Sequence, residues 1–338
     1  MNSIIIFIGS IVLLYLGRTL FLPLLVAAFF WYLLNAIAAY YRKALPWRSS
    51  RAMGVLSGLM SLATFGGLVY AFTTHIRPMF AGLIARLPEI QQRLLALQAY
   101  LSDQFGIAFN ESMLPDTGRL MSSLGSSATY FSASLGLVLV YALFMFIEQS
   151  TFSNKFSALF SEKRRADKMR YILKSVDGNM KKYMFVKTFS SVLTAATSYM
   201  LMSYMGLEFA GVWAFIIFVM NYIPTLGAVI AVALPVMYSL ITSTAADQTI
   251  ILASGLVALQ ILIGNLLEPK LTGKTLNLST LAILINLVFW GILWGPVGMF
   301  FSVPILVATF VATAQFDSTR WIAVLLSANG EIPEKKES

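Results

Sequence analysis

The sequence contains no cysteine and a single histidine, His75. Without cysteine the chain has no disulfide, no thiolate nucleophile and no cysteine-ligated metal. His75 stands at the end of an apolar segment beside Arg77 and Pro78, which favours a structural role for it. These absences exclude the common redox and cysteine-based reactions, and we expect neither a metal nor a cofactor.

Other catalytic patterns are also missing. The run Gly273-Lys274-Thr275 lacks the upstream glycine that a phosphate-binding loop requires. The sequence places no aspartate inside an apolar segment, so it offers no aspartate pair for intramembrane proteolysis. We therefore predict that the protein is not an enzyme.

Charged residues are scarce, at 12% of the 338 residues, whereas 58% are hydrophobic and the mean hydropathy is +0.77. Ordinary soluble domains have about a quarter charged residues. The composition predicts an all-α polytopic membrane protein. Its net charge of +9 comes from basic residues between apolar segments, as the positive-inside bias of membrane proteins explains. We expect no nucleic acid as a partner.

About eight hydrophobic segments are apparent, judged by the ~20 residues that a membrane-spanning helix needs. They cover residues 3–17, 20–40, 52–76, 128–147, 184–205, 209–241, 249–267 and 281–314. Segments 209–241 and 281–314 are too long for one straight crossing. Each is broken near its middle, the first at Asn221-Tyr222-Ile223-Pro224-Thr225-Leu226-Gly227 and the second at Gly295-Pro296-Val297-Gly298. Helix breaks at membrane depth are tolerated where other protein or a polar cavity satisfies the backbone.

Lysine and arginine predict the orientation. They are concentrated in 42–51 and 149–187, which we expect to be cytoplasmic. This places both termini in the cytoplasm and residues 77–127 outside, with the chain in a bacterial inner (plasma) membrane. For each over-long segment two interpretations stay open, a re-entrant hairpin or one kinked crossing. Hairpins place Lys270 and Lys274 inside, as the positive-inside rule prefers.

Two further helices are expected outside the transport core. In 83–101, leucine and isoleucine recur at alternating spacings of four and three, which predicts a helix seam that packs on this protomer or on another subunit. In 163–184, an apolar face is flanked by basic residues, which predicts a helix lying on the membrane surface.

From these segments and helices we predict six regions in the chain. These are N-terminal membrane helices (1–76), an extracytoplasmic helical insertion (77–127), a membrane helix (128–148), a cytoplasmic basic amphipathic helix (149–183), a transport core with broken helices (184–316) and a cytoplasmic tail (317–338).

The densest motif is Gly264-Asn265-Leu266-Leu267-Glu268-Pro269-Lys270-Leu271-Thr272-Gly273-Lys274, followed by Phe289-Trp290-Gly291, Gly295-Pro296-Val297-Gly298-Met299 and Val303-Pro304. Together with Asn221-Tyr222-Ile223-Pro224 and Lys187-Thr188, it resembles the autoinducer-2 exporter (AI-2E, PerM-like) transporter family over roughly 184–304. Thr280 and Ala195 depart from the family pattern, which commonly has proline and glycine there.

The resemblance implies a transporter that exports a small polar signalling molecule such as autoinducer-2, or one that exchanges sodium or lithium for protons. It also implies a homo-oligomer, with a pentamer known in the family. Since the only acids near apolar segments are Glu148, Glu208 and Glu268, the sequence favours a neutral or weakly anionic substrate over a cation. A membrane scaffold without transport stays a third alternative.

The expected substrate site lies at the broken helices. Its members are Asn221, Pro224, Thr225, Gly227, Asn265, Glu268, Pro269, Gly273, Asn286, Gly295, Pro296 and Gly298. Lys187, Thr188 and Glu268 are candidates for coupling or anchoring. Glu268 is either a coupling acid, a partner of Lys187 or a structural carboxylate before Pro269, and Lys187 is otherwise an interfacial lysine that reaches to the membrane surface.

Single cysteines introduced at Asp247 and Lys274 distinguish hairpins from kinked crossings, because the chain has no cysteine of its own. With hairpins, we expect a membrane-impermeant maleimide to label position 247 from outside in intact cells, and to label position 274 only after permeabilisation. A cytoplasmic position 247 would rule out the hairpin arrangement.

Overall fold

The computed structural model describes residues 2–44, 51–105, 136–149, 151, 155, 163–243, 246–272 and 277–332. Every regular element in these ranges is a helix, and the extended pairing found there is one isolated bridge between Leu278 and Ser327. This confirms the prediction of an all-α polytopic membrane protein.

The N-terminal half contains α1 (Asn2–Leu16), α2 (Arg18–Ala44), α3 (Arg51–Ala71), the π-helical turn η1 (Phe72–Ile76), α4 (Arg77–Ala85), α5 (Leu87–Phe105) and a short helix at Gly136–Gln149. Helix α3 runs through η1 into α4, so the predicted segment 52–76 continues nine residues further as a helix. The rest of the predicted insertion, 106–127, and the first residues of the segment 128–148 lie outside the described residues.

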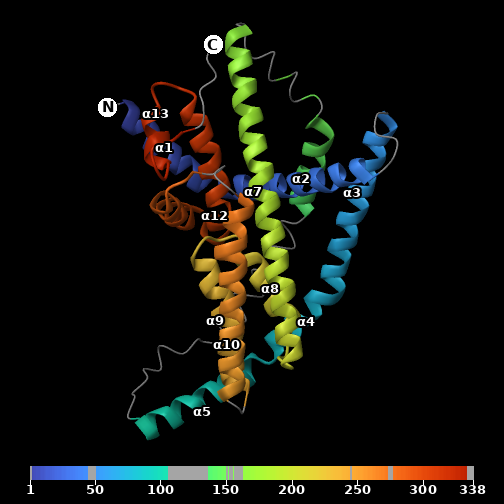
Figure 1. Cartoon of the computed structure of the whole chain (residues 1–338), viewed down its shortest axis with the longest axis vertical. Coiled ribbons are helices and arrows are strands. Elements are labelled where there is room, and N and C mark those ends of the chain that lie inside the picture. Colours follow the sequence, from blue (N-terminus) through green and yellow to red (C-terminus); the bar gives the residue numbers. More distant parts are fainter. Residues whose placement is uncertain are drawn as a thin grey trace.

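The C-terminal half contains α7 (Lys163–Tyr204), α8 (Ala210–Met220), α9 (Leu226–Thr242), α10 (Ala246–Gln260), the π-helix η3 (Ile261–Leu267), α11 (Glu268–Thr272), α12 (Thr280–Ala314) and α13 (Arg320–Leu326). Figure 1 shows α7 and α10 running side by side along the long axis of the molecule, while α2 runs across it.

Within the described residues, four helical stretches are long and apolar enough to cross a membrane by length and composition, namely Arg18–Lys43, Leu56–Ala85, Asp247–Leu271 and Thr280–Ala314. They match four of the predicted segments. Since α2 runs across the direction of α7 and α10 in Figure 1, these helices do not share one axis. The predicted orientation of the termini, which counts 20–40 as a full crossing, stays a prediction.

Helix α7 differs from the expectation. Its 42 residues form one continuous helix, about 63 Å long at 1.5 Å per residue. The predicted boundary between a surface-lying helix ending at residue 183 and a span beginning at 184 therefore falls inside one helix, whose two parts share one axis (Figure 1). The physical reason is that the apolar face carrying Ile172, Met180 and Tyr183 is buried against protein, which removes its need for a membrane surface.

The first over-long segment folds back on itself. The ring of Tyr238 near the end of α9 lies 6.1 Å from that of Phe209 and 5.3 Å from that of Trp213 at the start of α8. In a straight helix, residues 209 and 238 would be about 43 Å apart. Helices α8 and α9 are thus antiparallel arms of a hairpin, turning at residues 221–225.

The second over-long segment, α12, also folds back. Its backbone leaves the helical conformation at Gly295, where φ is 64° and ψ is −148°. Asn286 Nδ2 donates to the carbonyl oxygen of Ser302 at 2.5 Å, although a straight helix would separate these residues by about 24 Å. Residues 280–294 and 296–314 are the two arms. The stretch Thr280–Ala314 is therefore a pair of helices joined at Gly295 and not one long helix.

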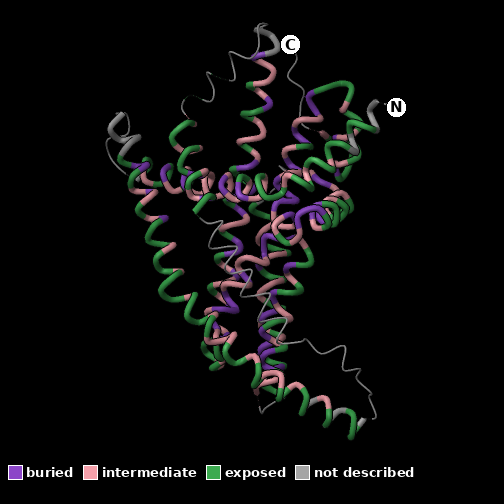
Figure 2. The backbone as a smooth tube through the Cα atoms, turned by 180° about the vertical axis from the view of Figure 1, so that it is seen from behind, coloured by how far each residue is buried: buried purple, intermediate pink, exposed green. Residues whose placement is uncertain are grey.

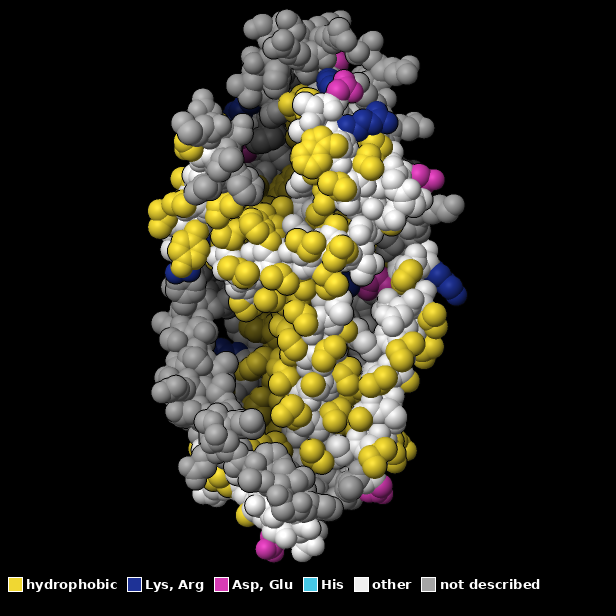
Figure 3. All heavy atoms as spheres, turned by 90° about the vertical axis from the view of Figure 1, so that its left-hand side faces the viewer, with side chains coloured by type: hydrophobic (Ala, Val, Ile, Leu, Met, Phe, Trp, Pro, Cys, Tyr) yellow, Lys and Arg dark blue, Asp and Glu magenta, His cyan; other side chains and the backbone are white. Residues whose placement is uncertain are grey.

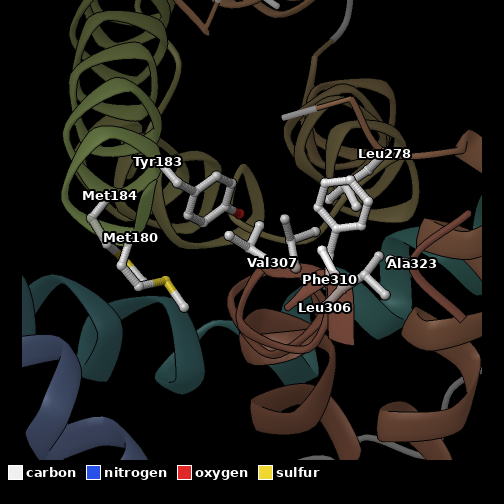
Figure 4. Packing of buried hydrophobic residues seen from close by; sticks show 10 residues of the cluster. Met180, Tyr183, Met184, Leu278, Leu306, Val307, Phe310 and Ala323 are labelled. Atoms are coloured by element: carbon white, nitrogen blue, oxygen red, sulfur yellow. The ribbon is translucent and has the colours of Figure 1, made fainter. Parts of the chain in front are cut away.

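The main buried cluster joins α7 to the second arm of α12 and to α13. Figure 4 shows the side chains of α7 facing those of α12 across this cluster. It contains Met180, Tyr183, Met184, Leu278, Val303, Leu306, Val307, Phe310, Ala314 and Ala323. Because Ala323 is completely buried, part of the predicted C-terminal tail is folded onto the core.

The outer surface is strongly apolar. In Figure 2 the buried residues follow the central helices, whereas α3 and α5 are mostly exposed or half-buried. In Figure 3 hydrophobic side chains cover a broad band along one face. On α7 the exposed residues include Phe185, Phe189, Val192, Met200 and Tyr204, a face of the kind that contacts lipid in a membrane.

The predicted seam in 83–101 packs at its beginning on the same protomer. Leu83 and Ile90 contact the buried cluster formed by α7, α8, α9 and α10. The side chains of Leu97 and Leu101 lie outside the described residues, so contact of the distal half with another subunit stays a prediction.

We expect Gly227→Ala to destabilise the first hairpin. A Cβ at residue 227 would lie 1.8 Å from the carbonyl oxygen of Met220 and force the two arms apart. Such overpacking costs about 1–3 kcal/mol, which a lower apparent melting temperature in detergent would report.

The matched control is Gly178→Ala in α7, where an added Cβ would meet nothing within 4 Å. Alanine favours helix by up to about 1 kcal/mol over glycine, so this variant should melt at the same or a higher temperature. Equal melting of wild type and Gly227→Ala would contradict the close contact.

Candidate functional site

Lys187 of α7 and Glu268 of α11 form an ion pair between these two helices. Lys187 Nζ lies 2.7 Å from Glu268 Oε1, and the side chains are only 12% and 23% exposed. Ser190, one turn further along α7, lies with its hydroxyl 3.1 Å from Glu268 Oε2. The structure therefore shows the pairing that the sequence left as one of three interpretations for Glu268. For Lys187 it replaces the interpretation of a lysine that reaches to the surface.

The π-helix η3 determines where Glu268 points. It lies directly before Glu268, whose backbone N–H donates to Ile263 O, five residues back. Each α-helical residue turns about 100°, so one extra residue in a widened turn moves the following side chains by about that angle. The widened turn aims Glu268 at α7, and such π segments are frequent at functional sites.

Thr188, the neighbour of Lys187, joins the same part of α7 to the first hairpin. The hydroxyl of Tyr222, at the turn between α8 and α9, donates to Thr188 Oγ1 at 2.8 Å. Consecutive residues on a helix point about 100° apart, so Lys187 and Thr188 reach two different neighbours. One turn of α7 thus binds both α11 and the first hairpin.

The turn of the first hairpin has further polar contacts. Asn221, which is 7% exposed, accepts a hydrogen bond from Gln260 Nε2 at 3.1 Å. The backbone N–H groups of Leu226 and Gly227 donate to the carbonyls of Pro224 and Ile223. These amides are already paired within the turn, so they are not free to bind a substrate in this conformation.

The two hairpins meet through aromatic rings. Tyr222 stacks on Phe300, with ring centroids 4.5 Å apart and an interplanar angle of 23°. Phe300 stands five residues after the break at Gly295, so the turn of the first hairpin rests beside the turn of the second. Phe29 of α2 completes the group, 5.6 Å from Tyr222 and 5.3 Å from Phe300.

The second hairpin is closed by its own contacts. Asn286 bonds across the arms to Ser302 and accepts a hydrogen bond from Trp290 Nε1 at 3.1 Å. A Cβ at Gly298 would lie 2.0 Å from the carbonyl oxygen of Trp290. Asn286 and Gly298 therefore hold the arms together, in a role that is structural in this conformation.

The other predicted site residues fall outside this polar cluster. Thr225, Asn265, Pro269 and Pro296 are exposed, and Pro224 and Gly295 are half-buried. Gly273 lies outside the described residues. The structure thus brings together Lys187, Thr188, Asn221 and Glu268, and adds three residues that the sequence analysis did not place in the site, Ser190, Tyr222 and Gln260.

These three residues differ in how readily the sequence identifies them as members of the site. Tyr222 lies inside the predicted break, so its position was a usable signal. Ser190 stands one helical turn after Lys187, on the same face of α7. Gln260 is recognisable only from the packing of α10 against the first hairpin. Among the described residues there is no group of three or more histidine, cysteine or acidic side chains that could hold a metal ion.

Comparison with known proteins gives one consistent result. Residues 4–317 match the family described as "AI-2E family transporter". The chain is 29% identical to "AI-2 transport protein TqsA" of Escherichia coli K12 over 96% of this chain and 95% of that protein. It is 28% identical to "Putative transport protein YhhT" of the same organism, over 90% of this chain and 86% of that protein.

A double-mutant cycle measures the ion pair. We expect Glu268→Gln or Lys187→Met alone to destabilise the protein by about 2–3 kcal/mol, less than the ~3–5 kcal/mol of a fully buried pair, because each leaves a mostly buried charge without its partner. The double variant should recover at least about 1 kcal/mol of the summed loss. Unfolding in detergent measures all three variants, and additive losses would show that the two charges do not stabilise each other.

Proposed function

Because the chain belongs to the AI-2E transporter family, we propose that it exports a small polar metabolite or signalling molecule across the bacterial plasma membrane. The observation that carries this proposal is the largely buried Lys187–Glu268 pair beside the turn of the first hairpin. Ionisable residues inside a membrane are costly and commonly belong to a transport pathway. Discontinuous helices that meet within the protein are the usual framework of such sites.

The ion pair acts as a latch in this proposal. In the present conformation it fixes α11 to α7, while the bond from Tyr222 to Thr188 fixes the first hairpin to the same turn. A polar substrate that bonds to Glu268 or Lys187 competes with the pair and loosens α11. The hairpins then move against α7, as one bundle moves against another in alternating access.

Exchange of sodium or lithium for protons is the second candidate, since Glu268 is the acid at the centre of this cluster. Its Oε1 is paired with Lys187 and its Oε2 is within hydrogen-bond distance of Ser190. A cation would have to displace the lysine, which supports a neutral or weakly anionic substrate instead. A scaffold without transport explains neither the paired hairpins nor the buried charges.

The partners belong to the same proposal. Lipid covers the apolar face of α7 that carries Phe185, Val192 and Met200. A homo-oligomer, pentameric according to the family resemblance, and cytoplasmic termini also stay predictions.

Transport in proteoliposomes tests the function. With autoinducer-2 on one side, we expect flux through the wild type and a loss of about tenfold or more in Glu268→Gln. The substrate bonds to this carboxylate in the proposal, and a hydrogen bond to a charged group contributes about 1.5–3 kcal/mol, more than the 1.4 kcal/mol that corresponds to tenfold. A sodium gradient applied separately, with a pH-sensitive dye, should give no proton movement.

The matched control is Glu148→Gln, which removes the acid of an exposed pair with Lys155, 61% and 54% exposed for the lysine and the glutamate. It should transport as the wild type does. Sodium-dependent proton movement that Glu268→Gln abolishes would establish the antiporter instead, and no flux of either kind would overturn the transport proposal.

A further inference from the structure

One hydroxyl of α7 near the ion pair is buried and unpaired. Ser191 is completely buried, and its Oγ makes no hydrogen bond to any part of the chain that the structure describes. A helical serine or threonine ordinarily bonds to the carbonyl oxygen three or four residues back, as Thr194 does to Ser190 O at 2.8 Å. An unpaired buried hydroxyl destabilises a fold, so Ser191 is better explained by binding than by packing.

The acceptor four residues before Ser191 already has two donors beside it. The carbonyl oxygen of Lys187 accepts the helical hydrogen bond from the N–H of Ser191 itself, and the hydroxyl of Ser190 lies 3.1 Å from the same oxygen. A carbonyl oxygen has two lone pairs. Lys187 O is therefore shared by two donors before the hydroxyl of Ser191 could reach it.

Helix geometry gives the direction in which Ser191 points. Each residue of an α-helix turns by about 100°. Ser191 therefore points about 40° from Lys187, and Thr188 points about 100° from Lys187 in the same sense. Lys187 contacts Glu268 of α11, whereas Thr188 contacts Tyr222 of the first hairpin. The side chain of Ser191 is thus directed between these two contacts, one turn further along α7.

A third polar contact joins the two neighbours of α7 to each other. Gln260, the residue before η3, donates to Asn221 Oδ1 at 3.1 Å, and Asn221 directly precedes Tyr222. Helix α7, the turn of the first hairpin and the stretch from Gln260 to Glu268 are therefore connected pairwise. We call this place the three-way junction, and its paired members are Lys187, Thr188, Asn221, Tyr222, Gln260 and Glu268.

Beyond the ion pair, α7 offers a substrate only uncharged groups. Residues 188–204 contain no charged side chain. The hydroxyls of Thr188, Ser190 and Thr194 each have a partner. Ser191 is the first hydroxyl past Lys187 that has none, about 6 Å further along the helix axis. A substrate that moves along α7 from the ion pair therefore meets this hydroxyl next.

The chemistry of a hydroxyl suits recognition without charge. It has one donor and two acceptor positions, so it bonds to either kind of polar group on a substrate. A buried hydroxyl also favours a ligand that places a polar group beside it over one that places an apolar group there, since the second leaves it unpaired. Ser191 would thus contribute to specificity as well as to affinity.

We propose that Ser191 is a substrate-binding residue, whose hydroxyl bonds to the substrate at the three-way junction. The inference rests on the proposed transport function, because it adds a residue to that same site. Ser191 is covered in the present conformation, so the junction opens before this bond forms. Release of the Lys187–Glu268 pair, which the transport proposal requires, supplies that opening.

The substitution Ser191→Ala tests the proposal, because it removes the hydroxyl and leaves the rest of the side chain. Equilibrium dialysis of the purified full-length protein in detergent measures the affinity, with isotopically labelled autoinducer-2 as the probe. We expect Ser191→Ala to weaken binding about fivefold, which corresponds to the loss of one neutral hydrogen bond. Its apparent melting temperature should equal or exceed that of the wild type, because the hydroxyl has no partner within the fold.

The matched control is Ser61→Ala in α3. Ser61 is also completely buried, but its hydroxyl donates to the carbonyl oxygen of Gly58 at 2.8 Å. This variant should bind autoinducer-2 as the wild type does and melt at a lower temperature, because it loses a hydrogen bond of the fold. The same substitution at two buried serines thus separates binding from packing.

Equal binding of autoinducer-2 by the wild type and Ser191→Ala would overturn the inference. So would an equal weakening in Ser61→Ala, a melting temperature of Ser191→Ala below that of the wild type, or no binding by the wild type. Binding that depends on Ser191, in a protein that gives no flux in proteoliposomes, would support this inference and overturn the transport proposal instead.

Discussion

The helical hairpins depend on a backbone contact that only glycine permits. At Gly227 and at Gly298, an added Cβ would lie within 1.8 and 2.0 Å of a carbonyl oxygen on the opposite side of the turn. In both hairpins, therefore, the second arm returns so close to the first that no side chain fits at the glycine. That contact puts Tyr222 beside Phe300, and through Tyr222 it positions the bond to Thr188 on α7.

The polar cluster at Lys187 gathers three elements of different kinds onto one turn of α7. The π segment before Glu268 turns its side chain toward Lys187, with which it forms the ion pair. The neighbouring Thr188 accepts a hydrogen bond from Tyr222 of the first hairpin. Each contact alone contributes a modest net stabilisation, since the ion pair must offset the cost of removing two charges from water. Together they attach both α11 and the first hairpin to one turn of α7, so a displacement of that turn would affect both.

The fold was most predictable from the sequence where a local rule leaves few choices. Segments 209–241 and 281–314 were too long for one crossing and carried glycine and proline near their middles, so a fold-back was predictable. Glu268 and Lys187 were recognisable because charges are rare in such a composition. The family relationship was visible in the residues around Glu268 and is confirmed by the match over residues 4–317.

What the sequence did not show depends on tertiary contacts. The basic half of α7 has the pattern of a surface helix, but burial of Tyr183 against α12 and α13 makes it part of one long helix. The backbone N–H groups of Leu226 and Gly227 are paired within the first turn, which the sequence pattern alone does not reveal. Arg86, just before α5, pairs with Glu208, which lies 122 positions away in the sequence. No spacing rule connects residues so distant.

The unbroken length of α7 has a mechanical meaning. A helix of about 63 Å that tilts by roughly 5° about one end carries its other end through on the order of 5 Å. Lys187 of the ion pair lies in α7, and Glu208 follows its end. One continuous helix therefore connects these two polar regions. A displacement at one end of α7 is therefore transmitted to its other end by the helix itself, without a chain of intermediate side chains.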